Sequence, residues 1–208
     1  MAFQCRIVVN AICRILGLLS LAAILRRCLA KFKKVLLKRS AYTLLRKGHP
    51  FYIMVDIHKH SFAPFKVAWK RMGSKIEAAV LSPIGDLYIG KKPLIPQETI
   101  SFIPNKNEAE AHYVCAILNS IEANTLVRSF SQLGGKSFAT PSILKEIKIP
   151  KFNPKDKLHK SLAALSKKAH KLKKRGKEAQ LQKVENEIDE CVAELYGLSR
   201  KELKRLRK

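Results

Sequence analysis

The spacing of apolar residues changes several times along this 208-residue chain. After a mostly apolar stretch at residues 7–25, Arg26–Leu45 sets apolar side chains at helical spacing against basic ones, which predicts one amphipathic helix. Short β-type runs then alternate with turns that contain Gly and Pro, a pattern typical of strands. We expect strands at Phe51–Ile57, Phe62–Trp69, Ile76–Leu81, Leu87–Ile89 and Ile100–Ile103, the last ended by Pro104.

Helical spacing returns after residue 105. Asn107 is a typical N-cap residue, and Glu108 and Glu110 follow it in the first turn of a predicted helix. A second helix is predicted over Ile121–Phe130. Ile143–Ile149 alternates isoleucine with polar residues, so we expect a strand there.

The last fifty residues have the most regular pattern. Apolar residues recur at alternating spacings of four and three in two runs separated by Arg175-Gly176, which predicts an antiparallel pair of helices. Gly197 is expected to end the second helix, and Ser199 with Glu202 forms a capping box for a short basic helix. The two runs are Leu158, Leu162, Leu165, Ala169, Leu172 and Leu181, Val184, Ile188, Cys191, Leu195.

Together these elements predict an α+β fold: a small mixed or antiparallel sheet with helices, followed by an antiparallel helical hairpin. We expect three parts along the chain. Residues 1–28 form an apolar N-terminal helix, residues 29–153 an α+β domain, and residues 154–208 the hairpin with its short basic helix.

The N-terminal stretch Ile7–Leu25 leaves three alternatives open. A membrane helix would carry Arg14 in mid-span, at a cost of roughly 3 kcal/mol. A signal peptide would need a small-residue cleavage site, for which Leu21–Ile24 is a poor match. An amphipathic helix packed on a larger protein would place Asn10, Arg14 and Gly17 on one face.

The formal net charge of +25 narrows the classes of partner. Such an excess attracts polyanions, nucleic acid first and an anionic membrane surface second. The five cysteines show no CxxC or Cys/His spacing, so we interpret them as reduced thiols in a cytosolic protein without a metal site. Asp56, His58 and His60 are interpreted as polar residues of a turn.

Two segments combine cations with groups that suit nucleic acid. Ser61–Lys75 places aromatic residues among cations and closes on Gly73-Ser74, although an amphipathic strand and turn with solvated lysines would look the same. Around Gly134-Gly135, backbone amides can approach an anion closely, without the spacing of a P-loop. The candidate DNA-binding residues are Lys66, Trp69, Lys70, Arg71, Ser74, Lys75, Arg128, Gly134, Gly135, Lys136, Ser137 and Phe138.

Four blocks of the sequence occur in the order found in one known family. SFAPFKVAWKRMGSKIEAAVL, EAHYVCAILNS, GGKSFATPSILKEIKIPKF and ENEIDECVAELYGL resemble the C-terminal target-recognition region of N6-adenine DNA methyltransferases. These are fused restriction–modification enzymes with a TaqI-like specificity domain, related to the specificity subunits of Type I systems. The resemblance covers about Leu29 to Leu203. It implies that the α+β unit reads duplex DNA and that the helical pair is a spacer or docking element.

The chain departs from this family where catalysis is concerned. The sequence has no [ND]PP[YF] motif and no glycine-rich cofactor motif, and Asn153-Pro154-Lys155-Asp156 lacks the second proline and the aromatic residue. We therefore expect no methylation by this chain alone, and S-adenosylmethionine only in a missing catalytic domain. The implied partners are duplex DNA and a separate methyltransferase or restriction subunit.

Three classes of function remain. The first is a cytoplasmic, sequence-specific module that recognises double-stranded DNA for a restriction–modification adenine methyltransferase. The alternative is a membrane-anchored basic protein whose other part faces RNA or lipid. An independent enzyme has least support, because no Cys–His, Ser–His or paired-carboxylate pattern stands out.

Overall fold

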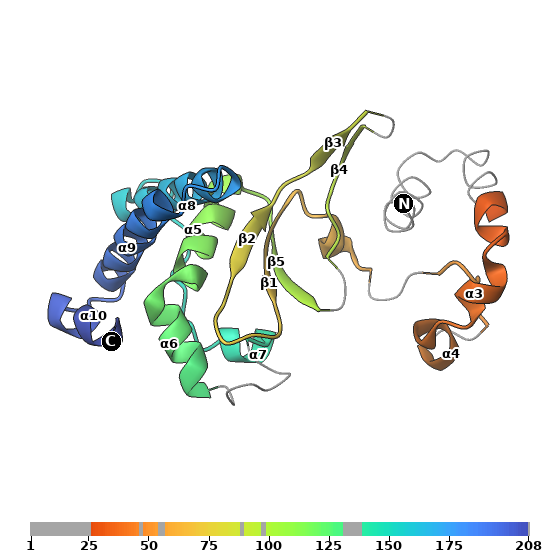
Figure 1. Cartoon of the computed structure of the whole chain (residues 1–208), viewed down its shortest axis with the longest axis horizontal. Helices are drawn as coiled ribbons and strands as arrows, with labels where there is room; N and C mark the ends of the chain where they lie inside the picture. Colours follow the sequence, from red (N-terminus) through yellow and green to blue (C-terminus); the bar gives the residue numbers. More distant parts are fainter. Residues whose placement is uncertain are drawn as a thin grey trace. The chain divides into compact units, whose positions relative to one another are not determined.

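A computed structural model of the chain describes residues 26–45, 48–53, 57–87, 90–96, 99–130 and 139–207. It divides into two compact units: residues 1–62 with 84–95, and residues 63–83 with 96–208. Helices and two small antiparallel sheets make up the described part, one sheet of three strands and one of two (Figure 1). The predicted α+β class is confirmed. The expected helix at residues 7–25 lies outside the described residues.

The first unit contains short elements. Residues 26–30 are helical, and α3 (Lys33–Leu37), α4 (Ser40–Leu45) and a 3-10 turn (Lys59–Phe62) follow. The prediction of one continuous helix over Arg26–Leu45 is therefore wrong. At the break between α3 and α4, the Arg39 guanidinium donates to the carbonyls of Phe51 and Ile53 at 3.0 and 2.9 Å.

The strand predicted at Phe51–Ile57 is also wrong in its described residues. Phe51 and Tyr52 form a turn closed by the Ile53 N–H, which donates to the Pro50 carbonyl; residues 54–56 lie outside the described part. Of the strand predicted at Leu87–Ile89, only Leu87 is described, and it lies in a turn; residues 88–89 lie outside the described part. The strands β3 (Ile84–Asp86) and β4 (Gly90–Lys92) pair with each other in an antiparallel ladder.

The second unit is built on a three-stranded antiparallel sheet in the order β2-β1-β5. The strands are β1 (Phe65–Lys70), β2 (Ala78–Leu81) and β5 (Ile100–Asn105), which confirms three predicted strands. Val67 and Trp69 alternate on the inner face of β1 and are buried.

Pro104 lies inside β5 rather than ending it. On β2, the N–H groups of Ala78 and Val80 point away from β1, so Ala79 and Leu81 make the bonds to Ala68 and Lys66 of β1. On the other side of β1, Lys66 lies opposite Pro104 of β5 in the strand register. Because the backbone N–H and C=O of Lys66 point toward β2, the backbone groups of Pro104 opposite it point away from β1. A proline at this position of β5 therefore removes no hydrogen bond between the strands.

Helix α5 (Glu108–Asn119) begins as predicted, with the Asn107 side chain accepting from the N–H groups of Ala109 and Glu110. Helix α6 (Ile121–Phe130) confirms the second predicted helix. The strand expected at Ile143–Ile149 is wrong: α7 (Pro141–Leu144) and a turn occupy its first part. Leu144, at the end of this short helix, and Ile147, just after the turn, are both buried. The apolar spacing therefore indicates which residues are buried, although the segment is not a strand.

The helical pair is confirmed as α8 (Lys157–Lys174) and α9 (Glu178–Leu195). After α9, the N–H groups of Gly197 and Leu198 donate to the carbonyls of Glu194 and Ala193, a Schellman motif in which Gly197 has a φ of 70°. Ser199 and Glu202 form the predicted capping box of α10 (Arg200–Leu206).

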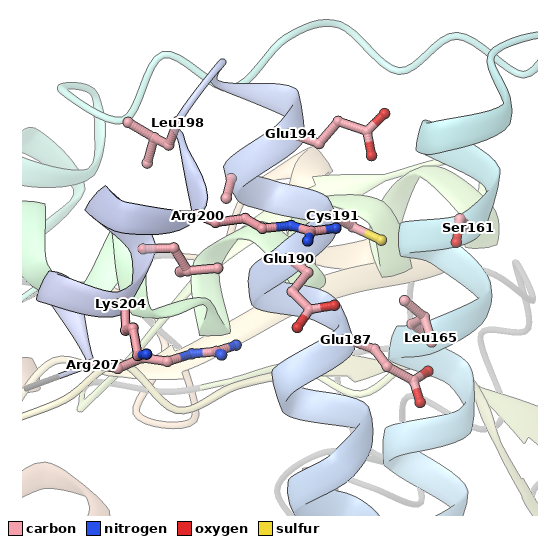
Figure 2. A pocket seen from close by; sticks show the side chains of 12 residues that line it. Ser161, Leu165, Glu187, Glu190, Cys191, Glu194, Leu198, Arg200, Lys204 and Arg207 are labelled. Carbon is pink, nitrogen blue, oxygen red and sulfur yellow. The ribbon is translucent and has the colours of Figure 1, made fainter.

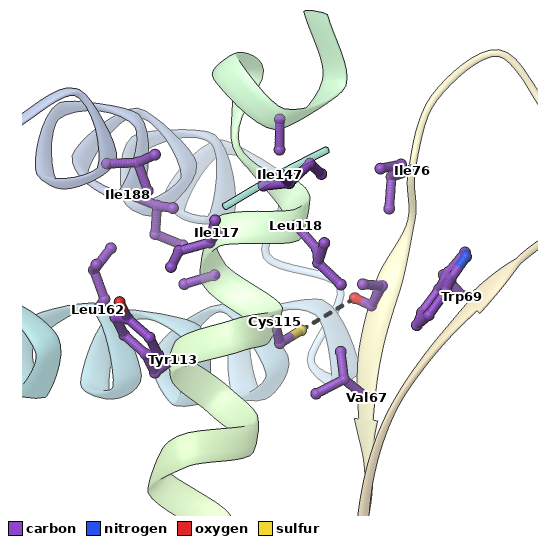
Figure 3. Close-up of a cluster of buried hydrophobic side chains, with 14 of the residues drawn as sticks. Val67, Trp69, Ile76, Tyr113, Cys115, Ile117, Leu118, Ile147, Leu162 and Ile188 are labelled. Atoms are coloured by element: carbon purple, nitrogen blue, oxygen red, sulfur yellow. Dashed lines mark hydrogen bonds between the residues drawn. The ribbon is translucent and has the colours of Figure 1, made fainter. Parts of the chain in front are cut away.

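One hydrophobic core joins the sheet to the helical pair, with α5 lying between them (Figures 1 and 3). Val67 comes from β1, Ile117 and Leu118 from α5, Leu162 from α8 and Ile188 from α9, and all five are buried. At roughly 25 cal/mol for each Å² of apolar surface removed from water, this shared core is the main stabilising contribution to the unit.

Side chains from two helices, α5 and α8, close the outer edge of β2. Asn119 forms two hydrogen bonds with Ala78: its Oδ1 accepts from the N–H at 2.8 Å and its Nδ2 donates to the carbonyl at 2.9 Å. The Ala78 carbonyl also accepts from the Cys115 thiol (Figure 3). The Val80 N–H donates to His170 Nε2 on α8 at 2.9 Å. These contacts satisfy the polar groups of an edge strand without another strand.

In the described part of the chain, no helix is both long enough and apolar enough to cross a membrane.

We expect Asn119→Ala to lower the free energy of unfolding by about 1–3 kcal/mol, because it leaves the Ala78 N–H without its partner. Urea unfolding of the full chain measures this change. Asn186→Ala, an exposed position on α9, is the control and should change stability by less than about 0.5 kcal/mol. An equal change in both variants would contradict the edge-closing role of Asn119.

Candidate nucleic-acid interface

The turn between β1 and β2 is held against α6. Its five residues 71–75 contain Gly73, whose φ of 147° lies in a region that other residues rarely adopt. At one end of the turn, the Arg71 N–H donates to the Thr99 carbonyl at 3.0 Å. At the other end, the Ile76 N–H donates to Asn124 Oδ1 of α6 at 2.7 Å. The turn is therefore anchored on both sides.

A second contact from α6 brings a cation to this turn. Arg128 lies one helical turn after Asn124, and its Nε donates to the Ser74 carbonyl at 3.1 Å. Arg71, Lys75 and Arg128 are exposed, and in the described part of the chain none of them forms an ion pair. We call the set Arg71, Met72, Ser74, Lys75 and Arg128 the turn surface.

Met72 gives the turn surface an apolar element. Its side chain is 54% exposed although the core lies close by. An exposed methionine between cations can contact the apolar part of a nucleotide base while the cations contact phosphate oxygens. Ser74 contributes through its backbone, since its carbonyl holds Arg128 in place.

Two predicted site residues lie inside the unit. Trp69 is 3% exposed, and its indole N–H donates to the Ala139 carbonyl at 2.8 Å. Lys66 is 1% exposed, its Nζ donates to the Ala63 carbonyl, and burial lowers its pKa. Neither side chain is accessible to a duplex in this structure.

The structure also places the remaining predicted residues. Lys70 is exposed and forms an ion pair of 3.4 Å with Glu77. Gly134, Gly135, Lys136, Ser137 and Phe138 lie outside the described residues. Ala139, which directly follows them, is bonded to Trp69, and Arg128 stands two residues before the end of α6. The residue that follows this segment is thus bonded to β1, the strand that leads into the β1–β2 turn.

Asn124 is a positioning residue that the sequence did not indicate. It is buried, its Oδ1 accepts from Ile76, and its Nδ2 donates to the Ser120 carbonyl. The spacing of Asn124 and Arg128 places both on one face of a predicted helix. Nothing local in the sequence tells that this face lies against the β1–β2 turn.

A hollow of about 930 Å³ lies elsewhere, between α8, α9 and α10 (Figure 2). Glutamates of α9 face cations of α10 across it, and Cys191 lies on its wall. Burial raises the pKa of the Cys191 thiol, which disfavours the reactive thiolate. In the described residues, no group of three or more His, Cys, Asp or Glu side chains is arranged to hold a metal ion. The hollow therefore offers no recognisable catalytic set.

A half-buried acid on α6 has a perturbed pKa. Both carboxylate oxygens of Glu122 on α6 are enclosed, and neither has a hydrogen-bond partner in the described part. Burial raises the pKa of Glu122 to about 7, and the neighbouring Asp189 makes a smaller contribution in the same direction. Asp189 joins α9 to α6, since its Oδ1 accepts from the Ile121 N–H at 2.9 Å.

We expect the fluorescence of Trp69, the only tryptophan, to be shielded from acrylamide. Its burial also predicts that saturating duplex DNA changes the emission little. Trp69→Phe should lower the free energy of unfolding, because the Ala139 carbonyl loses its donor, and should leave DNA affinity unchanged. Strong quenching by DNA, as base stacking would cause, would contradict the buried position.

The raised pKa of Glu122 predicts a pH-dependent effect of Glu122→Gln. Between about pH 4.5 and 7 the folded state binds more protons at Glu122 than the unfolded state, so this contribution to stability is lost as the pH rises through 7. The variant should therefore gain stability over the parent protein as the pH rises from about 5.5 to 8. Denaturant unfolding at both pH values measures the difference. An equal difference at both would show that the carboxyl group is not perturbed.

Comparison with known proteins does not assign this chain to a family. No protein-family model matches the chain, and no curated protein matches its sequence.

Proposed function

We propose that this chain recognises a specific sequence of double-stranded DNA for a restriction–modification adenine methyltransferase. The observation that carries the proposal is the turn surface. Arg71, Lys75 and Arg128 are exposed without an acidic partner in the described part, and two side chains of α6 hold the turn that presents them. The net charge of +25 supports a polyanionic partner.

The contacts of the turn surface suggest a division of roles. Arg128 uses its Nε to hold the Ser74 carbonyl, and its remaining N–H groups are available for a phosphate oxygen. Lys75 provides a point charge, which suits a phosphate contact in any sequence. Arg71 continues directly from β1, and its guanidinium can form the bidentate pair with guanine that reads sequence in the major groove.

The rigidity of the turn also fits recognition. A two-stranded β-ribbon is narrow enough for the major groove of B-form DNA. Because Arg71 and Ile76 are bonded at the two ends of the turn, the side chains between them lose less freedom on binding than those of a free loop would. The residues Gly134–Phe138 stay part of the proposed interface.

The proposal includes partners outside this chain. Its sequence has no [ND]PP[YF] motif, so adenine methylation would require S-adenosylmethionine and a catalytic domain on another part or polypeptide. The proposed location is the cytoplasm, where the DNA and such a partner are found. The alternative of a membrane-anchored protein rests on residues 7–25, and no observation on the described residues favours it.

Selection from a random duplex library should enrich one short motif, and binding should weaken linearly on a log–log plot against salt. Lys75→Ala, Arg128→Ala and Lys136→Ala should each weaken binding to all duplexes and reduce the salt slope by about one unit. Lys201→Ala on α10 is the control of equal charge. Enrichment of no motif would reject sequence recognition, and equal effects of Lys201→Ala would reject the turn surface.

Arg71 has a sharper test. Arg71→Lys keeps the charge but cannot form the two parallel hydrogen bonds to guanine. It should lower the preference for the selected motif over other duplexes by about ten-fold, while the salt slope stays the same. An unchanged preference together with a reduced slope would assign Arg71 to a phosphate instead.

A further inference from the structure

A second group of exposed cations lies where α8 meets α9. Seven of the eleven residues 167–177 are lysine or arginine, and three of them pair with acids: Lys167 with Glu108, Lys168 with Glu187, and Lys173 with Glu178. The other four are exposed and form no ion pair with any described residue. They are Lys171, Lys174, Arg175 and Lys177.

The backbone that carries these cations is fixed. A second Schellman motif ends α8: the N–H groups of Gly176 and Lys177 donate to the carbonyls of Lys173 and Leu172, both at 3.1 Å. Gly176 takes the left-handed conformation, with a φ of 67°. The cations are therefore presented by a defined turn, which we call the α8–α9 turn.

Helix electrostatics explains only part of this arrangement. Cations near the last turn of α8 interact favourably with its macrodipole. Lys177, however, is the N-cap of α9, where the dipole disfavours a positive charge, and its side chain caps no N–H. Four unpaired cations at one turn repel each other, and a bound polyanion would relieve this repulsion.

Glu77 and Lys173 connect this turn to the turn surface. Glu77 lies two residues after Lys75 and pairs with Lys70. The hydrogen bond with Glu178 is the main cause that raises the pKa of Lys173 on α8, and the charge of Glu77 adds a smaller contribution. The bond from Val80 to His170 fixes the last part of α8 against the edge of β2. Glu77 thus interacts with Lys70 beside the turn surface and, more weakly, with Lys173 near the α8–α9 turn, and all three belong to one compact unit.

We propose that the α8–α9 turn is a second phosphate-contacting surface for the duplex that the turn surface reads. This inference rests on the DNA-binding function proposed above and adds a second contact region to it. The α8–α9 turn offers cations without an exposed apolar or amide group arranged for base edges. It therefore contributes affinity for any sequence, and Glu77 weakens the binding by repelling the nearest phosphates.

The experiment compares two triple variants of the full chain. Lys171→Gln/Lys174→Gln/Arg175→Gln removes three charges at the α8–α9 turn. Lys174 and Arg175 follow Lys171 by three and four residues, so the three side chains share one face of α8. Lys201→Gln/Lys204→Gln/Arg205→Gln removes three exposed charges from α10 and is the matched control. Each variant is titrated with the selected duplex and a scrambled duplex over a range of salt, after a thermal melt confirms folding.

The α8–α9 variant should reduce the salt slope by about 0.9 for each phosphate that its side chains no longer neutralise, and should weaken both duplexes by the same factor. The α10 control should keep the slope of the parent protein. Glu77→Gln should tighten binding to both duplexes several-fold, because it removes a negative charge beside the proposed phosphate path.

Failure of the two proposals would look different. If the parent protein binds neither duplex, the DNA-binding function fails and the second surface with it. If the parent selects its motif but the α8–α9 variant matches it in slope and affinity, only the second surface is rejected. Equal losses in both triple variants would also reject it, since overall charge would then explain the effect.

Discussion

The second unit depends on how the outer edge of β2 is closed. A three-stranded sheet has two edges. Each backbone N–H or C=O that is buried at an edge without a partner costs a free energy comparable to that of a lost hydrogen bond. Here Asn119 of α5 occupies the place of a neighbouring strand, with an amide that resembles a peptide group. Asn124 extends the same closure to Ile76, so α5 and α6 fix both the strand and the turn that leads into it.

This closure links stability to the candidate site. The amide of Asn124 is shared between the edge of the sheet and the carbonyl of Ser120, and Arg128 follows it on the same helix. The geometry of the turn surface is thus set by groups in the interior. When interior residues hold the turn and exposed residues carry its charge, the cations can change during evolution with little effect on stability, because the side chains of Arg71 and Lys75 are exposed.

Sequence reasoning succeeded where structure is decided locally. The helical pair follows from regular apolar spacing, and its ends follow from Gly176, Gly197 and the Ser199–Glu202 box. It failed where a distant partner decides the outcome. Arg39, at the break between α3 and α4, donates to the carbonyls of Phe51 and Ile53, and no residue next to Arg39 in the sequence indicates these contacts. The same holds for Lys66, since a buried and a solvated lysine look alike in a sequence.

Pro104 has a consequence for how copies of this chain behave when many are crowded together. At that position of the outer side of β5, the strand offers no N–H to a strand from another molecule, so continuous strand addition there is interrupted. The other edge of the sheet is occupied by amide and imidazole side chains. Both edges thus resist the pairing that starts aggregation, which a polyanion that concentrates basic proteins would otherwise promote.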